Sequence, residues 1–244
     1  MAFDLEDCAP LQGYLERVQE FYDLGVRTLV PTYNIANCAG GGCLDECDQG
    51  LTSYGRDLVA ELNRVGMVVD GSHCGARTGL DLSTTSTRPM IYSHSCMRTV
   101  WDHPRNITDE QARACAATGG VIGITGVGVF LGPNDASLDA LVHHIDYAVE
   151  LIGPEHVGLA TDYPFDVKDF NRELLDNAEL FPDSYTRYGP IQFIPPEGLH
   201  RVEGALRARG YPTEAVVGIL GENFRRVARH CWRPGQPPLD DPAG

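Results

Sequence analysis

The segments Gly66-Met67-Val68-Val69-Asp70-Gly71-Ser72-His73 and Pro89-Met90-Ile91-Tyr92-Ser93-His94-Ser95 follow one pattern. In each, a short apolar run ends in a serine and then a histidine, which is how a buried parallel strand presents a side chain at its C-terminal end. The histidines are 21 positions apart. This interval fits one strand, one helix and the next strand, so His73 and His94 are predicted to point into the same mouth of a sheet.

Two converging imidazoles suit a zinc ion when a carboxylate joins them. A single histidine at a strand end is more often a structural residue held by hydrogen bonds. The repeated strand-end context makes a metal site as good an interpretation as a structural role, and both stay open at this point.

The composition predicts one globular domain. The chain has 244 residues, 43% of them hydrophobic and 22% charged. We expect the domain to span residues 1–233 and the Pro/Asp/Gly-rich residues 234–244 to form a flexible tail. The net charge of -15, from 34 acidic and 19 basic residues, argues against a nucleic-acid or anionic-membrane partner.

The first residues lack the basic start and apolar core of a secretory signal, and no later stretch approaches the roughly 20 apolar residues of a membrane span. A cytoplasmic protein is therefore expected, with its eight cysteines mostly as thiols. Cys38, Cys43 and Cys47 cluster in a glycine-rich loop, where a small metal site or a disulfide is an alternative. They lack the paired Cys-x-x-Cys spacing of structural zinc sites, so their role stays open.

Strand and helix patterns alternate along the chain. Strands are predicted at about residues 1–5, 26–31, 67–71, 90–93, 119–124 and 157–161. Helices are predicted at residues 10–24, 52–65, 108–118, 137–152, 198–209 and 213–230. The fold class is α/β, and the order predicts a TIM-type (β/α) barrel that is incomplete, with about six of eight strands. His143 and His144 are expected to be surface or helix-face residues of the helix over residues 137–152. Residues 163–196 form a long Tyr/Pro-rich excursion that could fold over the mouth.

Blocks along nearly the whole chain carry a family resemblance. They are residues 25–29, 50–52 with 55–56, 66–73, 91–95, 105–109, 119–124, 158–162 (Gly-Leu-Ala-Thr-Asp) and 221–227 (Gly-Glu-Asn-Phe-Arg-Arg-Val). These blocks occur in the same order as in the renal-type (membrane) dipeptidase family, which the chain therefore resembles. Members of this family are zinc peptidases of the amidohydrolase-like barrel. So many ordered blocks are a far more specific signal than one short motif.

The resemblance implies roles for five residues. His73 and His94 match two histidine ligands of one zinc, and Glu6 matches the carboxylate that bridges the family's two metals. Arg105 matches the arginine that holds the substrate's free carboxylate, a task that suits a planar bidentate donor. Asp162 matches the aspartate that moves a proton between the metal-activated water and the leaving amine.

Two departures from the family are visible. Tyr33 occupies the place of a histidine beside the reacting carbonyl, and its hydroxyl can still donate to an oxyanion. No His-x-Asp precedes Glu6, so we expect one zinc site to be retained and the second to lack these ligands. An opened barrel would expose apolar strand edges near Met1 and Val157, and a homo-oligomer or another polypeptide chain is expected to complete it.

The expected function is zinc-dependent hydrolysis of dipeptides by a metal-activated water, with a short peptide as substrate. Two alternatives remain. The chain is a non-catalytic or partner-dependent fragment of a dipeptidase, or it acts on an acylated amino acid, which also ends in a carboxylate that Arg105 could hold.

Overall fold

The computed structural model describes residues 2–178 and 181–232. Its strands follow one another in chain order and confirm the predicted α/β class. They are β1 (Phe3–Leu5), β2 (Val26–Leu29), β3 (Val68–Val69), β4 (Ile91–Tyr92), β5 (Val121–Ile124) and β6 (Val157–Leu159). Each lies inside a predicted strand. The predicted tail at residues 234–244 lies outside the described residues.

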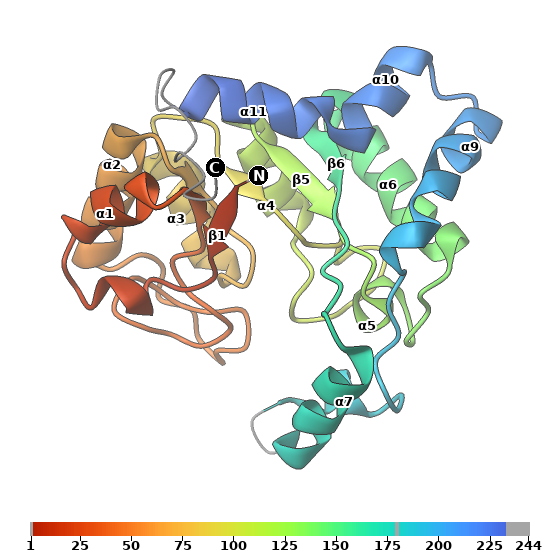
Figure 1. Cartoon of the computed structure of the whole chain (residues 1–244), viewed down its shortest axis with the longest axis horizontal. Helices are drawn as coiled ribbons and strands as arrows, with labels where there is room; N and C mark the ends of the chain where they lie inside the picture. The colour runs from red at the N-terminus through yellow and green to blue at the C-terminus, as the bar shows by residue number, and fades with distance from the viewer. Residues whose placement is uncertain (1, 179–180, 233–244) are drawn as a thin grey trace, which may run out of the picture.

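The six strands are parallel and form two sheets, β1-β2-β3 and β4-β5-β6. A single parallel bridge between Asp70 and Ile91 connects β3 to β4. The backbone N–H of Gly71 reinforces this junction by donating to the carbonyl of Ile91 at 2.8 Å. The strands therefore form a partial barrel, and their C-terminal ends lead into the same set of loops (Figure 1).

Helices follow the strands. They are α1 (Arg17–Asp23), α2 (Ser53–Val65), α3 (Ala76–Thr85), α4 (Asp109–Ala117), α5 (Gly128–Leu131), α6 (Leu138–Ile152), α7 (Val167–Asp176), α8 (Asp183–Thr186), α9 (His200–Ala208), α10 (Thr213–Val217) and α11 (Asn223–Cys231). Short 3₁₀ helices cover Ala9–Leu11, Pro154–His156 and Pro196–Gly198, and a π-helical turn covers Gly218–Glu222. Thr52 and Ser137 cap α2 and α6, and Thr108 and Gln111 form a capping box on α4.

The predicted helix over residues 10–24 is wrong in its first half. Only Ala9–Leu11 and α1 are helical, because Gln12 and Gly13 have φ values of 53° and 79°. Left-handed residues end a right-handed helix, and glycine reaches that region without a steric penalty.

Alternate residues of the strands pack on opposite faces of the sheet. Val69 and Tyr92 belong to the main core, whereas Val68, Ile91 and Val121 form a second cluster with Val227 and other residues of the C-terminal segment. Helix α11 therefore packs against the inner face of the barrel and lies across one end of it (Figure 1).

The two outer strands differ in exposure. Phe3 on β1 is 57% exposed, whereas Val157 on β6 is fully buried. Asn223 also donates through Nδ2 to the carbonyls of Val157 at 2.7 Å and Pro154 at 2.8 Å. The expectation of two exposed apolar edges therefore fails for β6, because the start of α11 covers it, and holds for β1.

No helix within residues 2–178 and 181–232 combines the length and the apolar composition of a membrane span.

Candidate metal centre and active site

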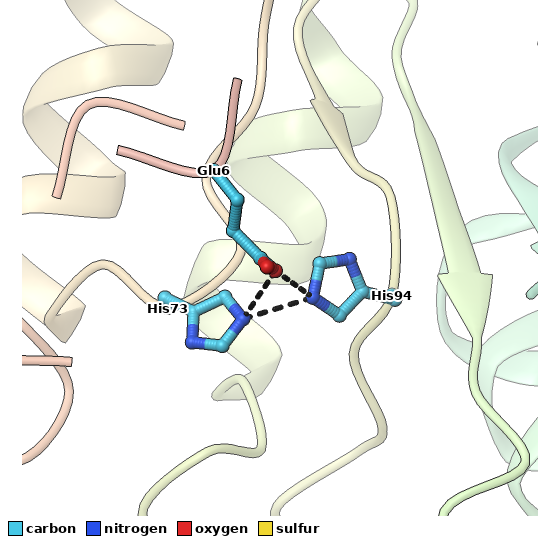
Figure 2. A group of neighbouring side chains, drawn as sticks. All are labelled: Glu6, His73 and His94. Atoms are coloured by element: carbon cyan, nitrogen blue, oxygen red, sulfur yellow. Dashed lines mark hydrogen bonds and ion pairs between the residues drawn. The ribbon is translucent and has the colours of Figure 1, made fainter. Parts of the chain in front are cut away.

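Glu6, His73 and His94 come from three different strand ends and converge on one point (Figure 2). Oε1 of Glu6 lies 2.9 Å from Nε2 of His73 and 3.1 Å from Nε2 of His94. The two Nε2 atoms lie 2.9 Å apart. Among the described residues, this Glu–His–His group is the one set of three or more potential ligands within reach of a single ion.

Asp70 holds together the two turns that carry the histidines. Its Oδ1 accepts hydrogen bonds from the backbone N–H of Ser72 at 2.9 Å and of Ser93 at 3.0 Å. The N–H of His94 donates in turn to Oγ of Ser72 at 3.2 Å. Because Asp70 and Ser72 are fully buried, the two turns are fixed relative to each other. Sequence reasoning assigned no role to Asp70.

The far nitrogens of both imidazoles have partners. Nδ1 of His73 donates to Oδ1 of Asn34 at 2.8 Å, and Nδ1 of His94 lies 2.6 Å from Oγ of Ser93. With protons on both Nδ1 atoms, both Nε2 lone pairs face the Glu6 carboxylate. Three acceptor atoms this close repel one another unless a proton or a metal cation lies between them, and partners on the far nitrogen are typical of metal-ligating histidines. The donor set therefore fits zinc.

The charges in the group are strongly perturbed. Burial and the charge of Arg105 lower the pKa of His73 well below its usual value, so its imidazole is neutral. Burial also disfavours the charged form of His94, but hydrogen bonding to Glu6 and the charge of Asp162 raise its pKa. Burial of Glu6 is likewise outweighed by its contacts with both histidines, which hold its pKa well below the usual range. Glu6 is thus an anion available to a cation.

Tyr33 stacks on the imidazole of His73, with ring centroids 4.1 Å apart and planes inclined by 25°. Burial and the nearby Glu6 carboxylate raise the pKa of Tyr33 to about 12. Its hydroxyl therefore stays protonated near neutral pH and can act as a hydrogen-bond donor.

Asp162 follows β6 in a left-handed conformation, with φ of 49°. It lines a cavity of about 430 Å³ together with Glu6, Tyr33 and His73. The structure therefore brings Asp162 to the mouth that holds the Glu–His–His group, although its own side chain is exposed.

Arg105 lies on the other side of His73. It is buried, and its guanidinium donates to the carbonyl of His94 at 2.9 Å and to Oγ of Ser95 at 3.3 Å. Its Nε has no hydrogen-bond partner among the described residues. Arg105 and His73 both line a second, smaller cavity of about 30 Å³, whereas Arg105 does not line the larger one.

Asn34 orients the imidazole of His73, and sequence reasoning assigned it no role. It has φ of 62°, and besides its bond to His73 it accepts a hydrogen bond from Sγ of Cys43 at 3.4 Å. Asparagine is one of the few side chains that tolerate this backbone region. An asparagine after an apolar strand is a weak signal, because it is also common in turns.

The remaining candidates lie elsewhere. All eight cysteines are free thiols, and the structure does not bring Cys38, Cys43 and Cys47 together as one ligand group. Of the two positions expected for His144, the surface is wrong and the helix face is correct, because this residue lies on α6 and is fully buried. It accepts from the N–H of Met97 at 3.1 Å, and its Nε2 lies 3.1 Å from the carbonyl of Leu131, so it is structural.

Comparison with known proteins gives one family. The family model described as membrane dipeptidase (peptidase family M19) matches residues 1–183. A Klebsiella pneumoniae protein described as uncharacterized, from the pqqA 5' region, is 32% identical over 96% of this chain and 82% of its own length. An uncharacterized dipeptidase of Schizosaccharomyces pombe is 30% identical over 97% of this chain, which spans 55% of that relative, about half its length.

Solved structures agree with the fold. A Pseudomonas aeruginosa amidohydrolase superposes with a TM-score of 0.83 at 31% identity, covering 94% of this chain and 72% of its own. A Rhodobacter sphaeroides metallo peptidase, liganded with a phosphinate mimic of the dipeptide L-Ala-D-Ala, superposes with a TM-score of 0.76 at 23% identity, covering 95% and 63%.

Proposed function

The chain belongs to the membrane dipeptidase family, peptidase family M19, and from this premise we propose that it is a zinc-dependent hydrolase of dipeptides. The observation that carries the proposal is the convergence of Glu6, His73 and His94, with one acceptor atom from each facing a common point. These residues would hold one zinc ion. When bound at such a site, zinc polarises a carbonyl and supplies a water that is nucleophilic at neutral pH.

The other residues supply positioning and proton transfer. Asp162 would take a proton from the attacking water and return it to the leaving nitrogen, as a general base and then a general acid. The Tyr33 phenol would donate to the oxygen that becomes negative in the transition state. Arg105 would bind the free carboxylate of the substrate, because its buried guanidinium keeps an unused N–H at Nε.

The direct test is hydrolysis by purified protein. Zinc-loaded protein is expected to release free amino acids from a dipeptide, activity is expected to disappear after chelation, and added zinc should restore it. The control is a dipeptide with a blocked C-terminus, which lacks the group for Arg105. A folded, zinc-loaded protein that cleaves no dipeptide would favour the alternative of a non-catalytic or partner-dependent barrel.

Arg105→Lys is expected to lower kcat/KM for a dipeptide with a free carboxylate by roughly 10- to 100-fold, because lysine keeps the charge and loses the planar two-point contact. Zinc content should not change. Comparison with the C-terminally amidated dipeptide separates the effects: its slow hydrolysis should fall by less than about threefold. Equal losses for both substrates would mean that the substitution disturbs the fold rather than carboxylate binding.

We also propose that the chain associates with another copy through the exposed edge of β1, where Phe3 is 57% exposed. Sedimentation at micromolar concentration is expected to give a species larger than a monomer. Phe3→Lys should shift the distribution toward monomer, because a charged residue on an edge strand opposes pairing. A cooperatively melting monomer in the unmodified protein would contradict the proposal.

A further inference from the structure

The larger cavity has walls of two kinds. On the side of the Glu–His–His group it is lined by Glu6, His73 and Tyr33. The opposite wall is aromatic and aliphatic and comes from the excursion after β6. Its main members are Phe170, Leu174, Phe181, Ile191 and Phe193. A cavity of about 430 Å³ has the size of small-molecule sites, which combine an apolar lining with a few polar groups.

This apolar wall is held together by its own hydrogen bonds and is anchored to the segment that follows β5. Asn171 of α7 accepts from the N–H of Ile191 at 2.6 Å and donates to its carbonyl at 3.1 Å. Phe193 forms an antiparallel bridge with Val127, and the N–H of Ile194 donates to the carbonyl of Gly126 at 2.9 Å. The ring of Phe193 also packs edge-on against Phe170, with centroids 5.5 Å apart. The wall is therefore formed before a ligand binds.

His73 connects the larger cavity with the smaller one. His73 lines both, whereas Arg105 lines only the smaller one. If a dipeptide is cleaved at the Glu–His–His group with its carboxylate on Arg105, its other end must lie in the larger cavity. This step rests on the proposed function.

Charge limits what the larger cavity accepts. Glu6 and Asp162 are the acidic residues that line it, and no lysine or arginine among the described residues does. A substrate carboxylate there would meet two like charges, and an apolar side chain would meet the aromatic wall. We propose that the substrate residue on the N-terminal side of the scissile bond carries a large apolar side chain of the phenylalanine or leucine type.

The test compares three dipeptides that share their C-terminal residue: Phe-Ala, Ala-Ala and Asp-Ala. Burial of a large apolar side chain is expected to make kcat/KM for Phe-Ala at least about tenfold higher than for Ala-Ala. Asp-Ala should be the poorest of the three. Equal values for Phe-Ala and Ala-Ala would overturn the inference and leave the proposed function intact.

Two variants test whether the apolar wall determines the preference for Phe-Ala. Phe193→Ala and Phe181→Ala should each reduce the Phe-Ala to Ala-Ala ratio to within about threefold of unity, since each removes an aromatic ring from the cavity. The ratio is measured within one protein preparation, so partial loss of folded protein cancels. Phe165→Ala is the matched control: Phe165 is fully exposed on the same excursion and does not line the cavity. It should leave the ratio unchanged.

A binding measurement tests the subsite even if the protein hydrolyses neither dipeptide. Titration calorimetry of zinc-loaded protein should give at least about tenfold tighter binding of Phe-Ala than of Ala-Ala, and Phe193→Ala should abolish the difference. That result without turnover would reject the proposed function and keep the subsite. Equal binding, or no binding of either dipeptide, would reject the subsite.

Discussion

His94→Ala is expected to remove tightly held zinc from the protein. The unmodified chain should retain about one zinc ion per chain after dialysis, because three protein ligands hold a catalytic zinc ion and leave one position open for water. Without His94, only Glu6 and His73 remain of the Glu–His–His group. The affinity for zinc should then fall by well over about 100-fold. Even the loss of a residue that only hydrogen-bonds to a metal ligand costs roughly 10- to 100-fold.

Elemental analysis after dialysis gives the zinc content, and competition with a chelator gives the affinity. Zinc should also raise the melting temperature of the unmodified protein and leave that of His94→Ala unchanged, since a ligand stabilises only the state that binds it. His143→Ala is the matched control, because His143 is exposed on α6 and outside the site.

Asn34→Gly provides an intermediate case. Glycine accepts the φ of 62° at this position and removes the acceptor that holds Nδ1 of His73. Zinc affinity should fall by roughly 10- to 100-fold, less than for His94→Ala. Folded unmodified protein without zinc, or equal zinc content in all of these variants, would contradict the metal site.

The parallel strands and their order could be predicted from sequence because the signal is local. A buried parallel strand is a short apolar run, and its C-terminal polar residue marks the mouth, as at His73, His94 and Glu6. The helix predicted over residues 10–24 failed for an equally local reason. The helical spacing of apolar residues continues past Gly13, but the left-handed backbone at Gly13 ends the helix.

What sequence could not supply is contact between distant segments. Asn34 and His73 are 39 positions apart, and no periodicity links them. The same holds for Asp70, whose carboxylate receives two backbone N–H groups from different turns. His144 is polar and follows His143, which is exposed, yet its own two nitrogens are satisfied by Met97 and Leu131 within the core.

Asp162→Asn is expected to lower kcat for dipeptide hydrolysis by roughly a hundredfold or more, the usual contribution of a positioned general base. Asp162 lines the cavity beside Glu6 and His73, and its negative charge is close enough to raise the pKa of both His94 and Tyr33. Asparagine has the same shape, tolerates the φ of 49° and cannot accept a proton at neutral pH. The fold and the zinc content should therefore be preserved.

Asp166→Asn is the matched control for this loss. Asp166 lies four positions later on the same excursion, does not line the cavity, and caps α7 by accepting from the N–H groups of Lys168 and Asp169. Asparagine is an equally good N-cap, so both stability and kcat should stay within about twofold of the unmodified protein. If Asp162→Asn kept its full zinc content and a kcat within about threefold of the unmodified protein, Asp162 would only shape the turn after β6. Another group would then have to accept the proton of the attacking water.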